Sequence, residues 1–274
     1  MRPPRPDIAA PELPNRVRWL NADRRPRIAE LAAAGPVLVH FFDFAQLNSV
    51  RALPYVLAWA ERYGDAGLAV LGVHSPRFTF TADRERLAPA LPRLGISHPV
   101  ADDADYVVWR DYGCRGWPSL FLWRRGGALR WAHFGEGEYE ATEREIQDEL
   151  RDRDPNVSLP EPLAPLRATD AAGALVAPPS DEVLPGGSES QPWRAGDGAE
   201  PLELAYEAGG AHASVDGGGE LRVAIDGEER AVPVDAPGLV DLAVHARHER
   251  HRLRLAGDGG IEVYSVSFSA GLPA

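Results

Sequence analysis

The sequence contains no lysine, a single cysteine and no long apolar run. All 29 basic residues are arginine, which excludes a Schiff-base mechanism or any other lysine chemistry. The single cysteine is Cys114, and one thiol can form neither an intrachain disulfide nor a multi-cysteine zinc site. No stretch of about 18 consecutive apolar residues is present, so no membrane-spanning helix is expected.

Positive charge is also scarce, because the formal net charge is −12. A protein that binds nucleic acid needs clustered basic residues to neutralise phosphates, so nucleic acid is not an expected partner. Residues 1–14 are rich in proline and arginine and lack the apolar core of a signal peptide. We interpret the exclusive use of arginine as base-composition bias in the source genome. A cytoplasmic, bacterial protein is therefore expected.

The first half of the chain alternates short apolar runs with helical patterns. In chain order the pattern predicts strand 37–42, helix 48–63 with a kink at Pro54, strand 68–73, helix 82–93, edge strand 99–101, helix 103–112, hairpin strands 119–123 and 128–134, and helix 138–150. The two early strand–helix–strand units require parallel pairing, and the hairpin adds antiparallel strands. The expected fold is an α/β domain whose mixed central sheet carries helices on both faces.

The second half of the chain differs from the first in composition and in hydrophobic pattern. Residues 155–192 carry eight prolines and no periodicity, which is typical of a semi-extended linker. From residue 193 onward, glycine-rich turns, among them Gly209–Gly210, separate runs of alternating apolar and polar residues at 202–206, 220–225, 239–245, 251–255 and 261–268. This pattern predicts about seven short strands in a β-sandwich. We therefore expect an α/β domain with an N-terminal arm at residues 1–154, a proline-rich linker at 155–192 and an all-β sandwich at 193–274.

Residues 38–55, LVHFFDFAQLNSVRALPY, resemble the redox-site segment of thioredoxin-like domains. The resemblance is strongest to the soluble C-terminal region of DipZ-type proteins and to the thioredoxin domain of NHL-repeat proteins. Further matching segments are Gly72–Pro76, His98–Val100, Asp105–Tyr106 with Trp109, Tyr112–Gly113, Trp117–Pro118, His133–Tyr139, Asp226–Gly227, His251–Leu253 and Ile261–Tyr264 with Phe268. The resemblance spans nearly the whole chain and implies a thioredoxin-like fold followed by a carbohydrate-binding-module-like β-sandwich.

One departure from that family pattern decides the expected function. The family carries two cysteines on the first turn of a proline-kinked helix, and here Gln46 and Ser49 stand at those positions. Neither side chain can form the thiolate or the mixed disulfide that dithiol exchange requires. The resemblance also implies a cis-proline at Trp117–Pro118, beside which the family backbone pairs with an extended peptide. The expected vestigial redox site, a possible peptide-binding surface, consists of Phe44, Gln46, Asn48, Ser49, Trp117 and Pro118.

Three functions follow from these residues. The first is a redox-inactive module that binds a peptide or protein partner, without cofactor or metal. The second is a thiol enzyme acting through Cys114, whose acidity the neighbouring Arg110 and Arg115 would increase. The third is glycan binding by the sandwich, for which four aromatic residues are available: Trp193, Tyr206, Tyr264 and Phe268.

Other polar residues receive structural interpretations. His40 takes the place of a buried acid in the family, and we expect a local carbonyl to bond its ring; a base for Ser49 is the alternative. The three histidines His245, His248 and His251 fall where one predicted strand turns into the next, so at most two can converge on a metal. Glu136 and Glu138 are expected near a helix N-terminus, where negative charge is favourable.

Overall fold

The computed structural model describes residues 1–3, 7–196, 198–257 and 259–273. Residues 4–6 of the expected N-terminal arm therefore lie outside the described part of the chain. The chain divides into two compact units. Unit 1 comprises Met1–Phe44, Asn48–Pro76 and Leu87–Leu166, and unit 2 comprises Ala45–Leu47, Arg77–Arg86 and Arg167–Ala274.

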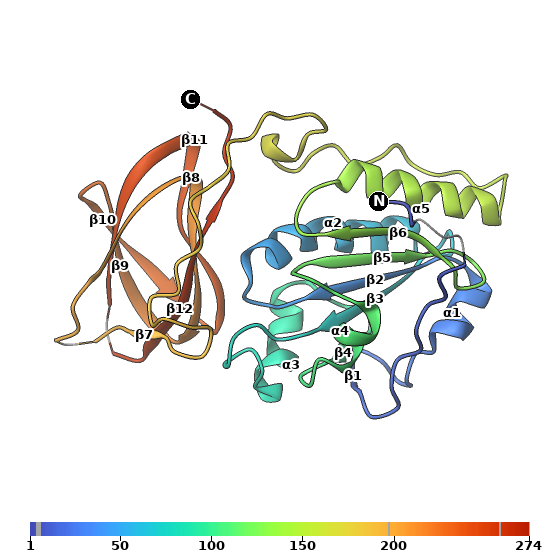
Figure 1. The fold of residues 1–274 in the computed structure, drawn as a ribbon, viewed down its shortest axis with the longest axis horizontal. Helices are drawn as coiled ribbons and strands as arrows, with labels where there is room; N and C mark the ends of the chain where they lie inside the picture. The colour runs from blue at the N-terminus through green and yellow to red at the C-terminus, as the bar shows by residue number, and fades with distance from the viewer. Residues whose placement is uncertain (4–6, 197, 258, 274) are drawn as a thin grey trace. The chain divides into compact units, whose positions relative to one another are not determined.

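Unit 1 is built on a six-stranded mixed sheet with the strand order β1-β4-β3-β2-β5-β6 (Figure 1). Its elements in chain order are β1 (Arg18–Leu20), α1 (Ile28–Ala34), β2 (Val37–Phe42), α2 (Leu47–Tyr63), β3 (Ala69–His74), α3 (Arg84–Arg93), β4 (Val100–Asp102), α4 (Val107–Tyr112), β5 (Ser119–Trp123), β6 (Leu129–Phe134) and α5 (Tyr139–Arg153). Strands β2, β3 and β4 run parallel, and the other three pairings are antiparallel. The first residue of α2 and the first three of α3 cluster with unit 2.

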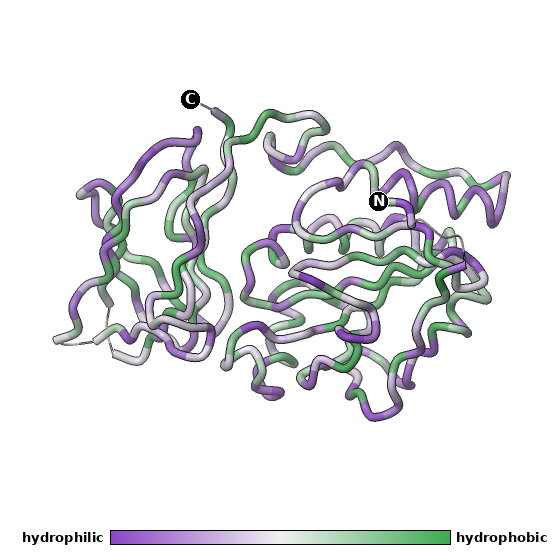
Figure 2. The backbone as a smooth tube through the Cα atoms, viewed as in Figure 1, coloured by the Kyte–Doolittle hydropathy of each residue, from purple (hydrophilic) through white to green (hydrophobic). Residues whose placement is uncertain are grey.

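Strand β2 shows why this sheet carries helices on both faces. All six of its residues are buried, as expected for a central strand. Because successive side chains point to opposite faces, Val37, Val39 and Phe41 join one apolar core while Leu38 joins the other. The first core is covered by α1 and α4, and the second by α2 and α5. Figure 2 shows hydrophobic residues concentrated in the central strands, whereas hydrophilic residues dominate α5.

Several predicted elements of unit 1 need correction. The sequence predicts an irregular arm at residues 1–26 and no helix before residue 37, but β1 and α1 both form. Strand β4 is not an edge strand, because β1 pairs with it. Helix α4 begins at Val107 instead of Asp103, since Asp103 accepts backbone N–H groups of its first turn. The predicted mixed sheet, the main helices and the hairpin are confirmed.

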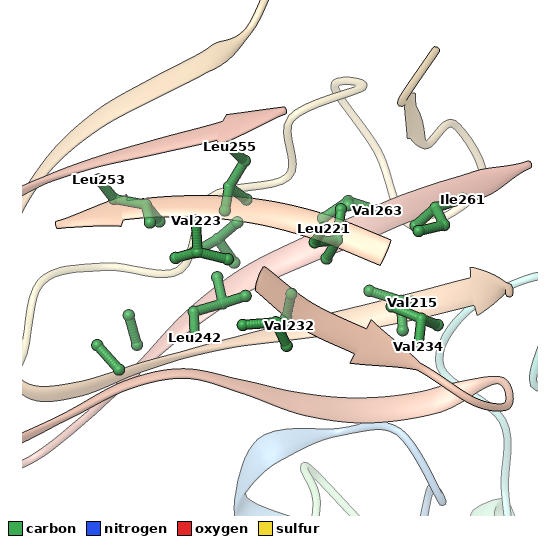
Figure 3. Close-up of a cluster of buried hydrophobic side chains, with 14 of the residues drawn as sticks. Val215, Leu221, Val223, Val232, Val234, Leu242, Leu253, Leu255, Ile261 and Val263 are labelled. Atoms are coloured by element: carbon green, nitrogen blue, oxygen red, sulfur yellow. The ribbon is translucent and has the colours of Figure 1, made fainter. Parts of the chain in front are cut away.

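Unit 2 contains a second, all-antiparallel sheet with the strand order β10-β9-β11-β8-β12-β7. Its elements are the short 3₁₀ helix η1 (Ala168–Asp170) and the strands β7 (Trp193–Arg194), β8 (Leu202–Gly217), β9 (Gly219–Ile225), β10 (Glu228–Val234), β11 (Gly238–Gly257) and β12 (Ile261–Ser269). Apolar side chains from β8 to β12 point into one shared core (Figure 3). An all-antiparallel sheet around one apolar core is consistent with the predicted β-sandwich.

The strands of unit 2 are fewer and longer than predicted. The predicted strands 239–245 and 251–255 are parts of β11, whose pairing with β8 shifts register between Val244 and Glu249. The predicted turn at Gly209–Gly210 lies inside β8. A Cβ on Gly209 would stand 2.6 Å from the Cα of Gly271, so this glycine permits a close backbone approach instead of a turn.

No helix within the described residues is long and apolar enough to cross a membrane.

Candidate functional site

Gln46 and Ser49, the residues expected in place of the family's two cysteines, lie at the start of α2. Ser49 sits in the first turn of the helix and is 1% exposed, and Gln46, just before Leu47, is 7% exposed. The hydroxyl oxygen of Ser49 accepts a hydrogen bond from the backbone N–H of Asp43, with an N···O distance of 3.2 Å. Asn48 is half-buried. The serine therefore ties the loop after β2 to the helix that follows it.

Phe44 belongs to the same loop and is buried. Its ring stacks on the imidazole of His74, the last residue of β3, with a centroid distance of 5.3 Å. The ends of β2 and β3 are thus bound together by an aromatic stack. Because both strands are parallel, the expected site residues Phe44 and Ser49 meet at the C-terminal edge of the sheet in unit 1.

Three aromatic residues next to Pro118 form what we call the aromatic cluster: Tyr106, Trp109 and Trp117. The rings of Trp109 and Trp117 are 4.5 Å apart, and Tyr106 meets both of them edge-on. The indole N–H of Trp117 donates to the carbonyl of Ser75, the residue after β3, over 2.7 Å. All three rings are half-buried, and the Trp117–Pro118 peptide bond is cis.

A buried carboxylate organises the backbone beneath the aromatic cluster. Asp103 accepts the backbone N–H groups of Val108 and Trp109 and the hydroxyl of Ser75, each over 2.9 Å. Burial raises the pKa of Asp103, while these three hydrogen bonds lower it. Asp103 was not among the site residues predicted from the sequence, although an aspartate just before a helix is a common N-terminal capping signal.

Cys114 lies in the apolar core of unit 1 and not on its surface. It packs in the same core as Phe41, Tyr112 and Phe121, and 9% of the residue is exposed. Burial raises the pKa of its thiol to about 12, although a hydrogen bond with Ser119 acts in the opposite direction. The arginines expected to acidify it, Arg110 and Arg115, are exposed. This environment favours the structural interpretation of Cys114 over the reactive one.

The Cys114 thiol should therefore be slow to react in the folded protein. At pH 8 we expect 5,5′-dithiobis(2-nitrobenzoate) to modify it at least ~100-fold more slowly in buffer than in 6 M guanidinium chloride, because both burial and the raised pKa suppress the thiolate. The measurement is release of thionitrobenzoate, with Cys114→Ser as the blank. Equal rates in the two solvents would contradict this assignment and favour the thiol-enzyme hypothesis.

The surroundings of His40 agree with neither of the two roles predicted for it. It is completely buried on β2, and neither ring nitrogen has a hydrogen-bond partner among the described residues. The predicted bond to a local carbonyl is therefore wrong, and so is the alternative in which His40 acts as a base on Ser49. Burial, with the charge of His98 second, lowers the pKa of His40 to about 3, so this imidazole is neutral at physiological pH.

His245, His248 and His251 all lie on β11. The rings of His245 and His251 stack at 3.7 Å, His245 bonds the Tyr206 hydroxyl and His251 bonds Asp226. His248 faces Glu207 instead. Two histidines converge, as predicted, but in the described part of the chain no group of three His, Cys, Asp or Glu side chains is arranged to hold a metal ion.

The glutamates and the aromatic residues singled out in the sequence have structural surroundings. Glu136 pairs with Arg51 over 2.7 Å, and Glu138 stands at the N-cap of α5 in a left-handed conformation. Of the four aromatic residues proposed for glycan binding, Trp193 is half-buried and the other three are buried, namely Tyr206, Tyr264 and Phe268. Buried rings offer no platform for a sugar, so their placement gives the glycan hypothesis no support.

About half of the chain is similar in sequence to parts of two longer proteins. The chain is 38% identical to protein DipZ of Mycobacterium tuberculosis over 154 residues, 56% of this chain and 22% of DipZ. It is 30% identical to NHL repeat-containing protein 2 of Homo sapiens over 132 residues, 48% of this chain and 18% of that protein. The matched region thus spans about a fifth of the length of these relatives. No family model matches the chain.

Solved structures with a similar fold include proteins named for thiol–disulfide chemistry. One is a thiol:disulfide interchange protein DsbE from Chlorobium tepidum, with 21% identity, a TM-score of 0.45, and coverage of 52% of this chain and 96% of that one. Another is the thioredoxin-like superfamily protein SPOA0173, with 25% identity, a TM-score of 0.47, and coverage of 56% and 99%. The mixed sheet of unit 1 has the thioredoxin-like fold expected from the sequence, and an all-antiparallel β domain follows it in the chain.

Proposed function

We propose that this protein is a thioredoxin-like module that does not exchange dithiols and instead binds an extended peptide segment of a partner protein. The observation that carries the proposal is the presence of Gln46 and Ser49 where the family pattern has its two cysteines. Disulfide exchange requires an attacking thiolate and a resolving thiol. The buried Cys114, with its raised pKa, is a poor substitute for either.

The aromatic cluster is the surface proposed to receive the peptide. Tyr106, Trp109 and Trp117 are each half-buried residues, so the aromatic cluster is not enclosed in the core of unit 1. Aromatic side chains supply a large contact area with little loss of conformational entropy, which is why they dominate many binding surfaces. Exposed Arg110 and Arg115 lie close by in the chain, but exposed Asp105 and Asp111 offset their charge. We therefore expect the bound segment to be apolar.

The first experiment tests the absence of redox catalysis. In an insulin-reduction assay with dithiothreitol, the protein should not accelerate precipitation of the B chain above the rate with dithiothreitol alone. A thioredoxin from any source serves as the positive control. Turnover that Cys114→Ser abolishes would overturn the proposal and establish the thiol-enzyme alternative.

The second experiment tests binding with a defined probe, reduced and carboxymethylated α-lactalbumin, which is permanently unfolded and acidic. Fluorescence anisotropy of the labelled probe should report micromolar binding, which Trp117→Ala weakens at least ~10-fold because an aromatic anchor is lost. Trp131→Ala is the matched control: Trp131 is a half-buried tryptophan on β6 that bonds Thr142 and lies outside the aromatic cluster. Equal loss in the two variants, or no binding by the parent protein, would refute the proposal.

A further inference from the structure

Unit 2 contains a hydrogen-bonded chain of three side chains on three adjacent strands. His212 lies on β8, Asp241 on β11 and Ser269 on β12. A carboxylate oxygen of Asp241 is 2.7 Å from Nδ1 of His212, and the hydroxyl oxygen of Ser269 is 3.0 Å from Nε2 of the same ring. The two ends of one imidazole are therefore occupied by a carboxylate and a serine.

The connectivity selects one tautomer of the neutral imidazole. A carboxylate only accepts hydrogen bonds, so Nδ1 carries the proton that it donates to Asp241. Nε2 of the neutral ring is then an acceptor, and the hydroxyl of Ser269 donates to it. This order of carboxylate, imidazole and serine is the one that activates serine nucleophiles on several unrelated folds, where it is recognised by geometry and not by sequence position.

The sheet register holds the three residues together. Asp241 is directly opposite His212, and Ser269 is opposite Gly210, two positions before His212 on the same strand. A Cβ on residue 210 would lie 2.8 Å from the Ser269 oxygen and 3.2 Å from Nε2 of His212. Glycine at this position therefore leaves the space in which the serine and the imidazole meet.

We propose that Ser269 is a nucleophile that accepts a small acyl group from an ester. The Ser269 oxygen attacks the ester carbonyl while its proton passes to Nε2 of His212. The bond to the alcohol then breaks, and His212 returns the proton to the departing alkoxide. Water attacks the acyl-serine in the same way, releasing a carboxylic acid and restoring the serine hydroxyl, so that ester and water give acid and alcohol.

Burial sets the size of the acyl group. Ser269 is 7% exposed, and the side chain of His212 is 5% exposed, whereas that of Asp241 is 69% exposed. Only a small acyl group, such as acetyl, is expected to reach a serine enclosed to this degree, while the alcohol part of the ester stays outside. This activity uses no residue of the aromatic cluster, so it stands independently of the peptide-binding proposal.

The test uses methanesulfonyl fluoride, a small reagent that sulfonylates activated serines with loss of fluoride, and 4-nitrophenyl acetate as the ester. We expect one adduct, mapped by mass spectrometry to Ser269, and release of 4-nitrophenolate, both abolished in Ser269→Ala. Asp241→Asn should slow both at least ~100-fold, because the asparagine no longer enforces the reactive tautomer. Because the side chain of Asp241 is largely exposed, we expect this variant to keep its fold, and circular dichroism checks that expectation.

Ser267→Ala is the matched control, because Ser267 lies two residues away on β12 and bonds Glu182 instead of a histidine. This variant should react like the parent protein. The proposal is overturned when Ser269 remains unmodified after prolonged exposure, when other serines are labelled as fast, or when Asp241→Asn reacts at the parental rate.

Discussion

Replacement of His40 by phenylalanine should stabilise unit 1 at neutral pH and make its stability much less sensitive to acid. His40 is completely buried, its ring stacks on Phe42 with a centroid distance of 5.3 Å, and neither nitrogen has a hydrogen-bond partner among the described residues. A buried polar group without a partner costs about 1–3 kcal/mol. Phenylalanine keeps the aromatic shape and removes that cost, so we expect a gain of about 1 kcal/mol at pH 7.5.

The acid effect follows from the pKa of His40, which burial and the nearby His98 lower to about 3. The unfolded chain binds a proton near pH 6.5, whereas the folded chain does not until about pH 3. The stability contribution is therefore complete above pH 6.5 and is lost as the pH falls toward 3, by up to about 1.4 kcal/mol per pH unit. His98, whose pKa burial lowers to about 4, acts in the same direction.

The measurement is urea unfolding of both proteins between pH 4.5 and 7.5, followed by tryptophan fluorescence. Six of the seven tryptophans lie in unit 1, so this signal reports on that unit. Between pH 6.5 and 5.0 the parent protein should lose about 2 kcal/mol more than His40→Phe. Identical pH dependence of the two proteins would show that the lowered pKa of His40 does not cause the loss of stability in acid.

The sequence pattern predicted correctly those elements whose signals lie within a short stretch of the chain. The run Val37–Phe42 is apolar throughout and forms the buried strand β2, and apolar residues at helical spacing predict α2, which includes Pro54. The predicted hairpin at 119–134 forms, and its turn contains Gly126 and Gly127, whose φ angles are 92° and 83°. Such features are encoded within a few residues, so a single sequence suffices to find them.

Helix α1 was missed because its capping group comes from a distant residue. Its N-cap residue, Arg27, makes no side-chain capping bond. Instead the carboxylate of Glu12 accepts the backbone N–H groups of Ile28 and Ala29, over 3.3 and 2.6 Å. A start signal separated from the helix by this much chain has no local signature. The three-residue strand β1 was missed for a similar reason, since its partner β4 lies about eighty residues later.

The candidate sites differ in the same way, because one lies in a contiguous segment of the sequence and the other is assembled by strand pairing. Gln46 and Ser49 were found because the family pattern is contiguous, and the structure places both at the start of α2 as expected. The group formed by His212, Asp241 and Ser269 was not found, because its members are brought together only by strand pairing. Their separations of 29 and 57 residues follow from the register of β8 with β11 and β12. No spacing rule for a single sequence covers such a constellation.

Asp103→Ala should have the largest effect of any single substitution near the aromatic cluster. It removes an acceptor that satisfies two backbone N–H groups of α4 and the hydroxyl of Ser75. Hydrogen bonds to a charged group contribute about 1.5–3 kcal/mol each, and buried donors left without a partner carry a further cost. The effects at one site overlap, so we expect a loss of about 3–4 kcal/mol in the free energy of unfolding.

The same substitution should weaken binding of the α-lactalbumin probe under conditions where the variant is folded. Asp103 holds Ser75, whose carbonyl anchors the Trp117 indole, and it also caps the helix that carries Trp109. Asp103→Asn is the matched control, because its amide oxygen replaces one of the two acceptor atoms and should give intermediate values. Stability within 0.5 kcal/mol of the parent would contradict the capping role. Reduced stability with unchanged binding would mean that the carboxylate supports the fold but does not position the rings that receive the peptide.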